Sequence, residues 1–116
     1  MVAGSKTVTF IFNEGLVRIS TGIINKMEKP SFIRFLLNIK EEKLILVPLT
    51  KKDQQCVKVN YDLKSEHNGV RIYSKLLAEK IYAIMNWNLN RAYRIESVVE
   101  FEDKTFIVDL NDAIVA

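Results

Sequence analysis

The feature that most constrains this chain is an order of predicted elements that occurs twice within 116 residues. Each half contains a β-branched strand, a second short strand, a helix and a hairpin with a charged tip. The segment Val17–Arg18–Ile19 is matched by Val70–Arg71–Ile72. Thr21 and Ser74 then follow at the same offset, where each can cap a helix. The pattern predicts an internal duplication, with the same folding unit present in both halves.

In the first half, the strands are expected at Thr7–Phe12 and Leu16–Ile19, because both segments are rich in β-branched and aromatic residues. Apolar residues at helical spacing predict a helix over Thr21–Lys29. Pro30 ends that helix, since proline lacks an amide donor and disfavours helical geometry in the preceding residue. Alternating apolar residues before an acidic tip and a continuous apolar run after it predict a hairpin over residues 32–49.

In the second half, short strands are expected at residues 57–61 and 70–72. The clearest helix is Lys75–Trp87, which Ser74 can cap and which carries one apolar stripe. The stripe consists of Leu77, Ile81, Ile84 and Met85. A hairpin over residues 92–110 completes this half.

The two hairpins can be aligned by their alternation. Residues 92–101 are expected to form one unbroken strand, in which Ile95, Val99 and Phe101 share an apolar face with Tyr93. The apolar residues of the two hairpins correspond only if the tip of the second hairpin is one residue shorter than the tip of the first. A slip of one residue would otherwise turn the apolar face outward.

We therefore expect a mixed α+β fold that is mainly β, with two helices and an internal duplication. Residues 1–116 should form a single compact domain, because a chain of this length buries about two-thirds of its surface. The repeats span about residues 6–50 and 57–110, and a polar linker at residues 50–56 joins them. One unit of about 50 residues would bury too little surface alone.

Composition and motifs argue against several classes of protein. Cys56 and His67 are the only residues of their kinds, which excludes an intrachain disulfide and metal sites built from several cysteines or histidines. The chain contains no phosphate-binding glycine loop, dinucleotide fingerprint or hydrolase motif. We expect no enzyme, no metal and no cofactor. With no apolar run of signal-peptide or membrane-spanning length, we expect a cytoplasmic protein away from the membrane.

A glycine precedes each short strand, as Gly15 and Gly69, and a helix and an acidic-tipped hairpin follow. This order resembles the AbrB/MazE swapped-hairpin family, with both copies in one chain as in its MraZ-like branch. The family often has arginine directly after this glycine, where Leu16 and Val70 stand here. The resemblance implies a small swapped-hairpin barrel and a non-enzymatic transcriptional regulator that binds duplex DNA.

Arg18 and Arg71 occupy equivalent repeat positions, so paired units would make them symmetry mates. Two equivalent guanidinium groups suit two phosphate strands or half-sites. The net charge of +3 permits an anionic partner. Alternatively, both are solvent-facing polar residues on a surface of mixed charge. The candidate DNA contacts are Arg18, Arg71, Lys26, Lys51, Lys52, Lys75 and Arg91.

Other interpretations remain open at the level of sequence. The chain could be a protein-interaction module, antitoxin-like or accessory, without nucleic-acid binding, or a domain that forms a homodimer through an exposed sheet edge. Tyr82, Trp87 and Tyr93 could stack on single-stranded bases, although aromatic residues beside a helical stripe more often belong to a core. Cys56 is expected to be a buried or half-buried side chain without a chemical role.

Overall fold

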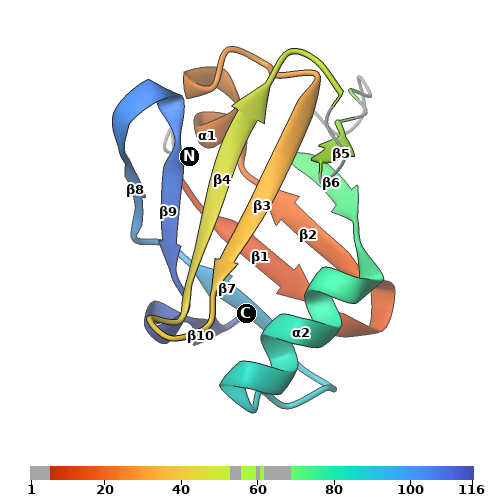
Figure 1. The fold of residues 1–116 in the computed structure, drawn as a ribbon. Helices are drawn as coiled ribbons and strands as arrows, with labels where there is room; N and C mark the ends of the chain where they lie inside the picture. Colours follow the sequence, from red (N-terminus) through yellow and green to blue (C-terminus); the bar gives the residue numbers. More distant parts are fainter. Residues whose placement is uncertain (1–5, 53–55, 60, 62–68) are drawn as a thin grey trace.

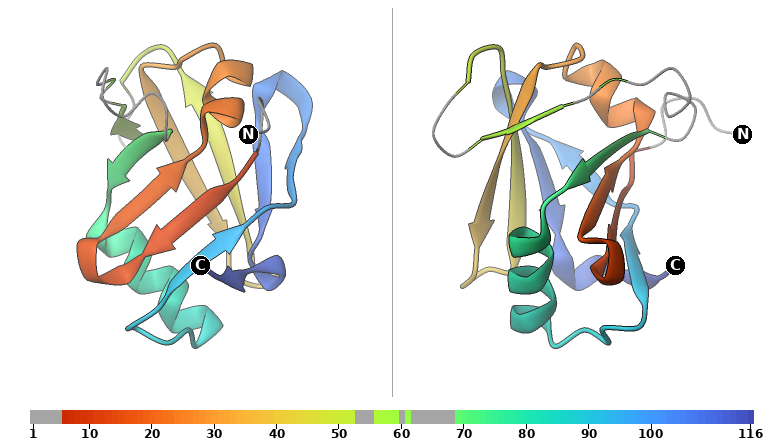
Figure 2. Two further views of the ribbon diagram at one scale, coloured as in Figure 1. Left: turned by 180° about the vertical axis from the view of Figure 1, so that it is seen from behind. Right: turned by 90° about the vertical axis from the view of Figure 1, so that its right-hand side faces the viewer.

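The computed structural model describes residues 6–52, 56–59, 61 and 69–116. Two five-stranded antiparallel sheets lie face to face (Figures 1 and 2). In spatial order, the first sheet consists of β10 (Ile114–Val115), β7 (Ala92–Ile95), β1 (Val8–Ile11), β2 (Leu16–Ile19) and β6 (Val70–Tyr73). The second consists of β5 (Cys56–Lys58), β3 (Phe32–Asn38), β4 (Lys43–Leu49), β9 (Phe106–Asp109) and β8 (Val98–Glu100).

Two α-helices, α1 (Thr21–Lys26) and α2 (Lys75–Met85), complete the fold. Among the described residues, single turns of 3₁₀ helix connect strands at η1 (Phe12–Glu14), η3 (Glu102–Lys104) and η4 (Leu110–Asp112). The predicted mixed class, mainly β with two helices, is confirmed. The pairing of the described residues gives two separate sheets and does not close a barrel. Neither helix is long and apolar enough to cross a membrane.

The core lies between the two sheets and draws on both halves of the chain. Alternate residues of each strand point inward, as the period of a strand requires. Val8 and Phe10 of β1 and Leu44 and Leu46 of β4 are fully buried. All four belong to one continuous cluster that includes Phe106 of β9. Burial of a side chain of this kind contributes about 1.5–3 kcal/mol.

The two glycines that precede β2 and β6 both have a left-handed backbone. Gly15 has φ +58°, and a Cβ there would lie 3.1 Å from the Cα of Lys75. Gly69 has φ +88°, and a Cβ there would lie 2.2 Å from the carbonyl oxygen of Ile19. No other residue has room at this second position, so the close approach between β6 and the end of β2 depends on glycine.

The helices begin and end differently from the sequence prediction. The N-cap of α1 is Ser20 and not Thr21, which is the first helical residue. The Ser20 hydroxyl accepts a hydrogen bond from the Thr7 amide (2.9 Å), because β1 runs beside this turn. Helix α1 ends at Lys26, three residues before the predicted end. Ser74 is the N-cap of α2, as predicted, and a left-handed Asn86 ends that helix before Trp87.

The first strand of the second hairpin is not continuous, contrary to the prediction. The chain leaves the first sheet after β7 and enters the second sheet at β8. Glu96 and Ser97 lie at this crossing, and the Ser97 hydroxyl hydrogen-bonds an Asp112 carboxylate oxygen (2.8 Å). The alternation shifts at the crossing, so Val98 is buried whereas Val99 and Phe101 are about 60% exposed. The predicted apolar face with Ile95 was therefore wrong beyond residue 95.

The connection between the halves is shorter than predicted. Cys56, placed in the linker, belongs to β5, whose residues pair with β3. The Val59 amide continues this pairing with a hydrogen bond to the Ser31 carbonyl (2.9 Å). Residues 53–55 of the expected linker, and the loop that carries His67, lie outside the described residues.

Candidate nucleic-acid interface

The two arginines singled out by the repeat lie directly opposite each other. Strands β2 and β6 pair antiparallel, and the register places Arg18 across from Arg71. The flanking pair, Val17 and Ile72, is buried in the core. Because neighbouring residues of a strand point to opposite faces, both arginines project from the outer face of the first sheet.

A third arginine extends this pair across the sheet. Thr9 of β1 lies opposite Arg18 on one side and opposite Arg94 of β7 on the other. The four side chains therefore form a row across β7, β1, β2 and β6, which we call the arginine row: Arg94, Thr9, Arg18 and Arg71. With strands about 4.8 Å apart, the row is about 14 Å long. The left view of Figure 2 faces this side of the sheet.

The electrostatics of the row favour an anion. Like charges directly opposite each other destabilise an antiparallel pair. Arg71 is exposed, whereas Arg18 is half-buried, and the Nε atom of Arg18 is buried with no hydrogen-bond partner among the described atoms. Of the three arginines, only Arg94 forms an ion pair with a described residue, at 3.0 Å from Glu96. A bound anion would offset the repulsion between Arg18 and Arg71 and could accept the unused hydrogen bond.

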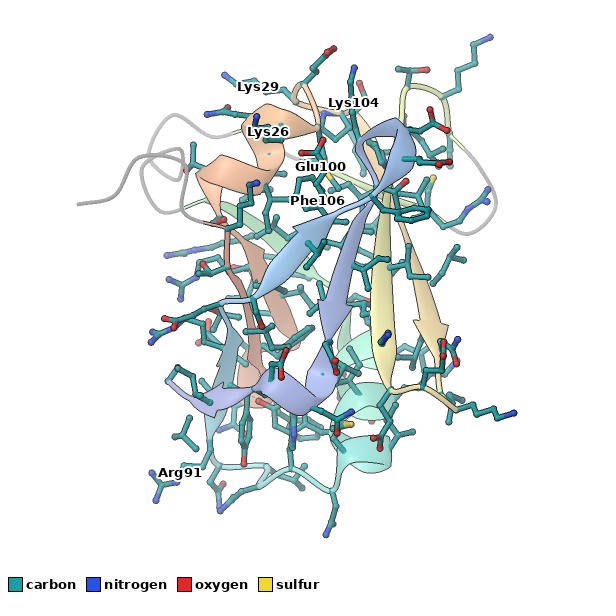
Figure 3. All side chains as sticks on the ribbon, turned by 90° about the vertical axis from the view of Figure 1, so that its left-hand side faces the viewer. Lys26, Lys29, Arg91, Glu100, Lys104 and Phe106 are labelled. Carbon is teal, nitrogen blue, oxygen red and sulfur yellow. The ribbon has the colours of Figure 1, made fainter. Side chains whose placement is uncertain are left out.

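The other predicted DNA contacts do not join this row as one surface. Lys26 ends α1 and Arg91 precedes β7, and Figure 3 shows them at opposite ends of the molecule. Lys75 begins α2 and packs its backbone against Gly15. Lys51 and Lys52 are exposed in the segment that follows β4. Of the seven predicted residues, only Arg18 and Arg71 are cross-strand partners.

Arg94 was absent from the predicted contacts. The alternation of Tyr93, Arg94 and Ile95 shows only that Arg94 lies on the opposite face from its neighbours. Its place in the row depends on β7 pairing with β1, which is more than 80 residues away in sequence. No local signal identifies that partner.

Tyr82 belongs to the core, and Trp87 and Tyr93 pack against it, as expected for aromatic residues beside a helical stripe. Tyr82 is 1% exposed, and its hydroxyl lies 3.0 Å from the Phe10 carbonyl oxygen and 2.7 Å from that of Arg91. Trp87 stacks on Tyr93 with ring centroids 4.4 Å apart. Burial raises the pKa of Tyr82. Contacts of these rings hold α2 and β7 against β1. The rings are therefore not arranged to stack on bases.

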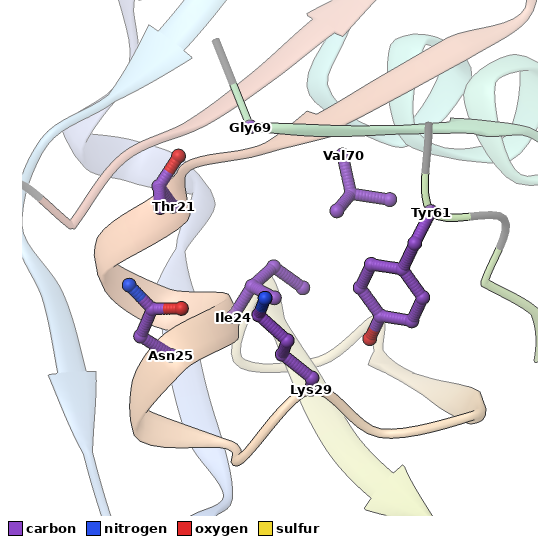
Figure 4. Close-up of a pocket in the computed structure, with 7 residues that line it drawn as sticks. All are labelled: Thr21, Ile24, Asn25, Lys29, Tyr61, Gly69 and Val70. Atoms are coloured by element: carbon purple, nitrogen blue, oxygen red, sulfur yellow. The ribbon is translucent and has the colours of Figure 1, made fainter. Parts of the chain in front are cut away.

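A pocket of about 250 Å³ lies between α1 and the start of β6 (Figure 4). Tyr61 forms one wall, and its hydroxyl donates a hydrogen bond to the Pro30 carbonyl (2.5 Å). Burial raises the pKa of Tyr61 to about 12, so the phenol stays protonated near neutral pH. Among the described residues, the pocket lining contains no carboxylate, histidine or cysteine. In the described ranges, no three histidine, cysteine, aspartate or glutamate side chains lie together as metal ligands would.

Comparisons of this chain with protein-family models, curated proteins and solved structures find no match.

Proposed function

We propose that this chain is a small, non-enzymatic, cytoplasmic DNA-binding regulator built from two copies of one swapped-hairpin unit. In this proposal the arginine row contacts the phosphates of duplex DNA. The single observation that carries it is the register of β2 and β6, which places Arg18 opposite its repeat equivalent, Arg71.

The strand registers support the duplication. Val17 lies opposite Ile72 and Ile19 lies opposite Val70, which is the pattern of a local twofold axis through the arginine pair. A second pair of corresponding strands, β4 and β9, is also joined directly, with Ile45 opposite Ile107. Leu44–Val108 and Leu46–Phe106 flank that pair on its two sides, again in symmetric order.

The remaining pairings also correspond between the halves. Strand β7 pairs with β1, and β3 pairs with β5, so the first strand of each hairpin joins the first strand of the other copy. The hairpin of β3 and β4 corresponds to that of β8 and β9. This exchange is what a swapped-hairpin arrangement requires. Strands β1 and β2 pair with each other, whereas the corresponding strands β5 and β6 do not pair among the described residues. A closed small barrel is therefore proposed here and does not follow from the strand pairing.

The charge of the row suits the backbone of DNA. A duplex carries about eight phosphate charges over the 14 Å that the row spans, at one charge per 1.7 Å. Arginine can form bidentate hydrogen bonds to phosphate. The two to three contacts that the row can make predict affinity that falls about 10- to 40-fold between 50 and 200 mM salt.

A fluorescence-anisotropy titration with mixed-sequence duplex DNA at several salt concentrations tests the proposal. We expect saturable binding at 50 mM salt and a slope of log K against log salt of about −2 to −3. Absence of binding at 50 mM salt would overturn the proposal. Binding without salt dependence would also overturn it, because the arginine row could not then be the contact.

A protein-interaction module without DNA binding is the second candidate. The observation that favours it is a set of exposed apolar side chains on the outer face of the second sheet, at Leu36, Val99 and Phe101. This candidate predicts no retention of duplex DNA in the same titration.

A further inference from the structure

The outer face of the second sheet carries an apolar row where the first sheet carries arginines. Leu36 of β3 lies opposite Ile45 of β4, which lies opposite Ile107 of β9, which lies opposite Val99 of β8. The residues next to them, such as Leu44 and Val108, are buried in the core, so the row itself faces outward. In Figure 1 the second sheet lies in front of the first.

A second row beside it continues the apolar surface. Arg34 lies opposite Val47, and at the far side the Phe101 amide donates to the Thr105 carbonyl (2.6 Å), which extends the pairing of β8 and β9. Leu36 is 40% exposed, Val99 60% and Phe101 59%. We call this surface the apolar face, and it consists of Leu36, Ile45, Val47, Val99, Phe101 and Ile107.

We infer that the apolar face binds a second copy of this chain. Two copies of the face are complementary under a twofold axis that lies between them and runs parallel to the strands. That axis places β8 of one copy over β3 of the other at the same level along the strands. Val99 of one copy then packs on Leu36 of the other, and Phe101 lies over Arg34, where a guanidinium can stack on the aromatic ring.

The area of the face sets the strength of this dimer. Side chains of this size expose about 150–200 Å² each when fully open, so at their observed exposures the face offers on the order of 400 Å². Two copies would bury about 800 Å², which is below the roughly 1,200 Å² of a stable specific interface and in the range of weak, transient contacts. The dimer is therefore expected to be transient and to dissociate on dilution. The inference is independent of DNA binding, since the core separates this face from the arginine row.

Sedimentation equilibrium of the whole chain at increasing concentration measures the association. We expect the average mass to rise from one chain toward two, and Val99→Lys to keep the protein monomeric at every concentration. Ile39→Lys is the matched control, because Ile39 is 62% exposed but lies beyond the end of β3. A monomer at all concentrations overturns the inference, as does an equal effect of the two variants.

A crosslinking experiment tests the geometry without relying on a charged substitution. In a Cys56→Ser background, Leu36→Cys and Val99→Cys chains are mixed under mild oxidation. The twofold arrangement predicts mixed disulfide dimers in at least several-fold excess over those formed when Ile39→Cys replaces Leu36→Cys. Equal yields from the two mixtures overturn the proposed dimer.

Discussion

The outer faces of the two sheets differ although their inner faces are alike. Inward residues of both sheets are aliphatic or aromatic, and Phe10 in the first sheet and Phe106 in the second are fully buried. Outward, the central row of the first sheet carries three arginines, whereas that of the second carries only apolar residues. Since the core constrains only alternate positions, the outward positions are free to differ. Two sheets with similar inner faces can thus present a charged face and an apolar face on opposite sides of one molecule.

The largest expected effect tests whether the inner faces are equivalent. Phe10→Ala in the first sheet and Phe106→Ala in the second should each lower the free energy of unfolding by about 3–5 kcal/mol, because both leave a cavity in one shared core. Urea denaturation followed by circular dichroism and by Trp87 fluorescence measures this. Val99→Ala, on the apolar face, is the control and should change stability by less than about 1 kcal/mol. Transitions that differ between the two probes would show two independently folding sheets and contradict the comparison.

A smaller effect sharpens the contrast between the outer faces. Arg71→Thr should raise the free energy of unfolding by about 0.2–1 kcal/mol, because it removes a like charge directly opposite Arg18. The same change should weaken DNA binding and make its salt slope shallower by about 0.9. Thermal denaturation and the anisotropy titration measure the two effects. Lys58→Thr on β5 of the second sheet is the control, and an equal loss of DNA binding there would contradict a specific role for the row.

The smallest expected effect concerns a hydrogen-bonded tyrosine hydroxyl near each sheet. Tyr61 bonds the carbonyl that precedes the second sheet's β3, and Tyr82 lies against a carbonyl of β1 in the first. Burial raises the pKa of Tyr61 to about 12 and also raises that of Tyr82. An unfolded tyrosine ionises near pH 10, so this contribution is present below pH 10 and is lost as the pH rises toward 12.

Urea denaturation at pH 9 and pH 11 measures this loss of stability at alkaline pH. Tyr61→Phe should lose less stability than the unmodified chain between the two pH values, because one ionisation linked to unfolding has been removed. Tyr82→Phe provides the corresponding comparison in the first sheet. An unchanged pH dependence in both variants would contradict the contribution of burial.

Much of the fold followed from local patterns. β-Branched and aromatic content predicted the strands over residues 7–12 and 16–19, and an apolar run predicted the strand over residues 43–49. The match between Val17–Arg18–Ile19 and Val70–Arg71–Ile72 singled out Arg18 and Arg71. The register of β2 and β6 then made them cross-strand partners. The remaining predicted lysines were chosen for their charge alone. The presence of a charge in two separate segments does not indicate whether those segments share a surface. In the structure these lysines are dispersed.

Up to Ile95, the sequence by itself indicated which face of a strand meets the core, because burial of alternate apolar side chains stabilises one phase of each strand and disfavours the other. Only the tertiary structure decided which strands became neighbours. The crossing at Glu96 and Ser97 placed β7 beside β1, and that pairing brought Arg94 into line with Arg18 and Arg71. It also left β8 at the edge of the second sheet, with Val99 and Phe101 facing outward. Contacts between residues far apart in sequence settle such choices, since backbone pairing is equally possible with several strands.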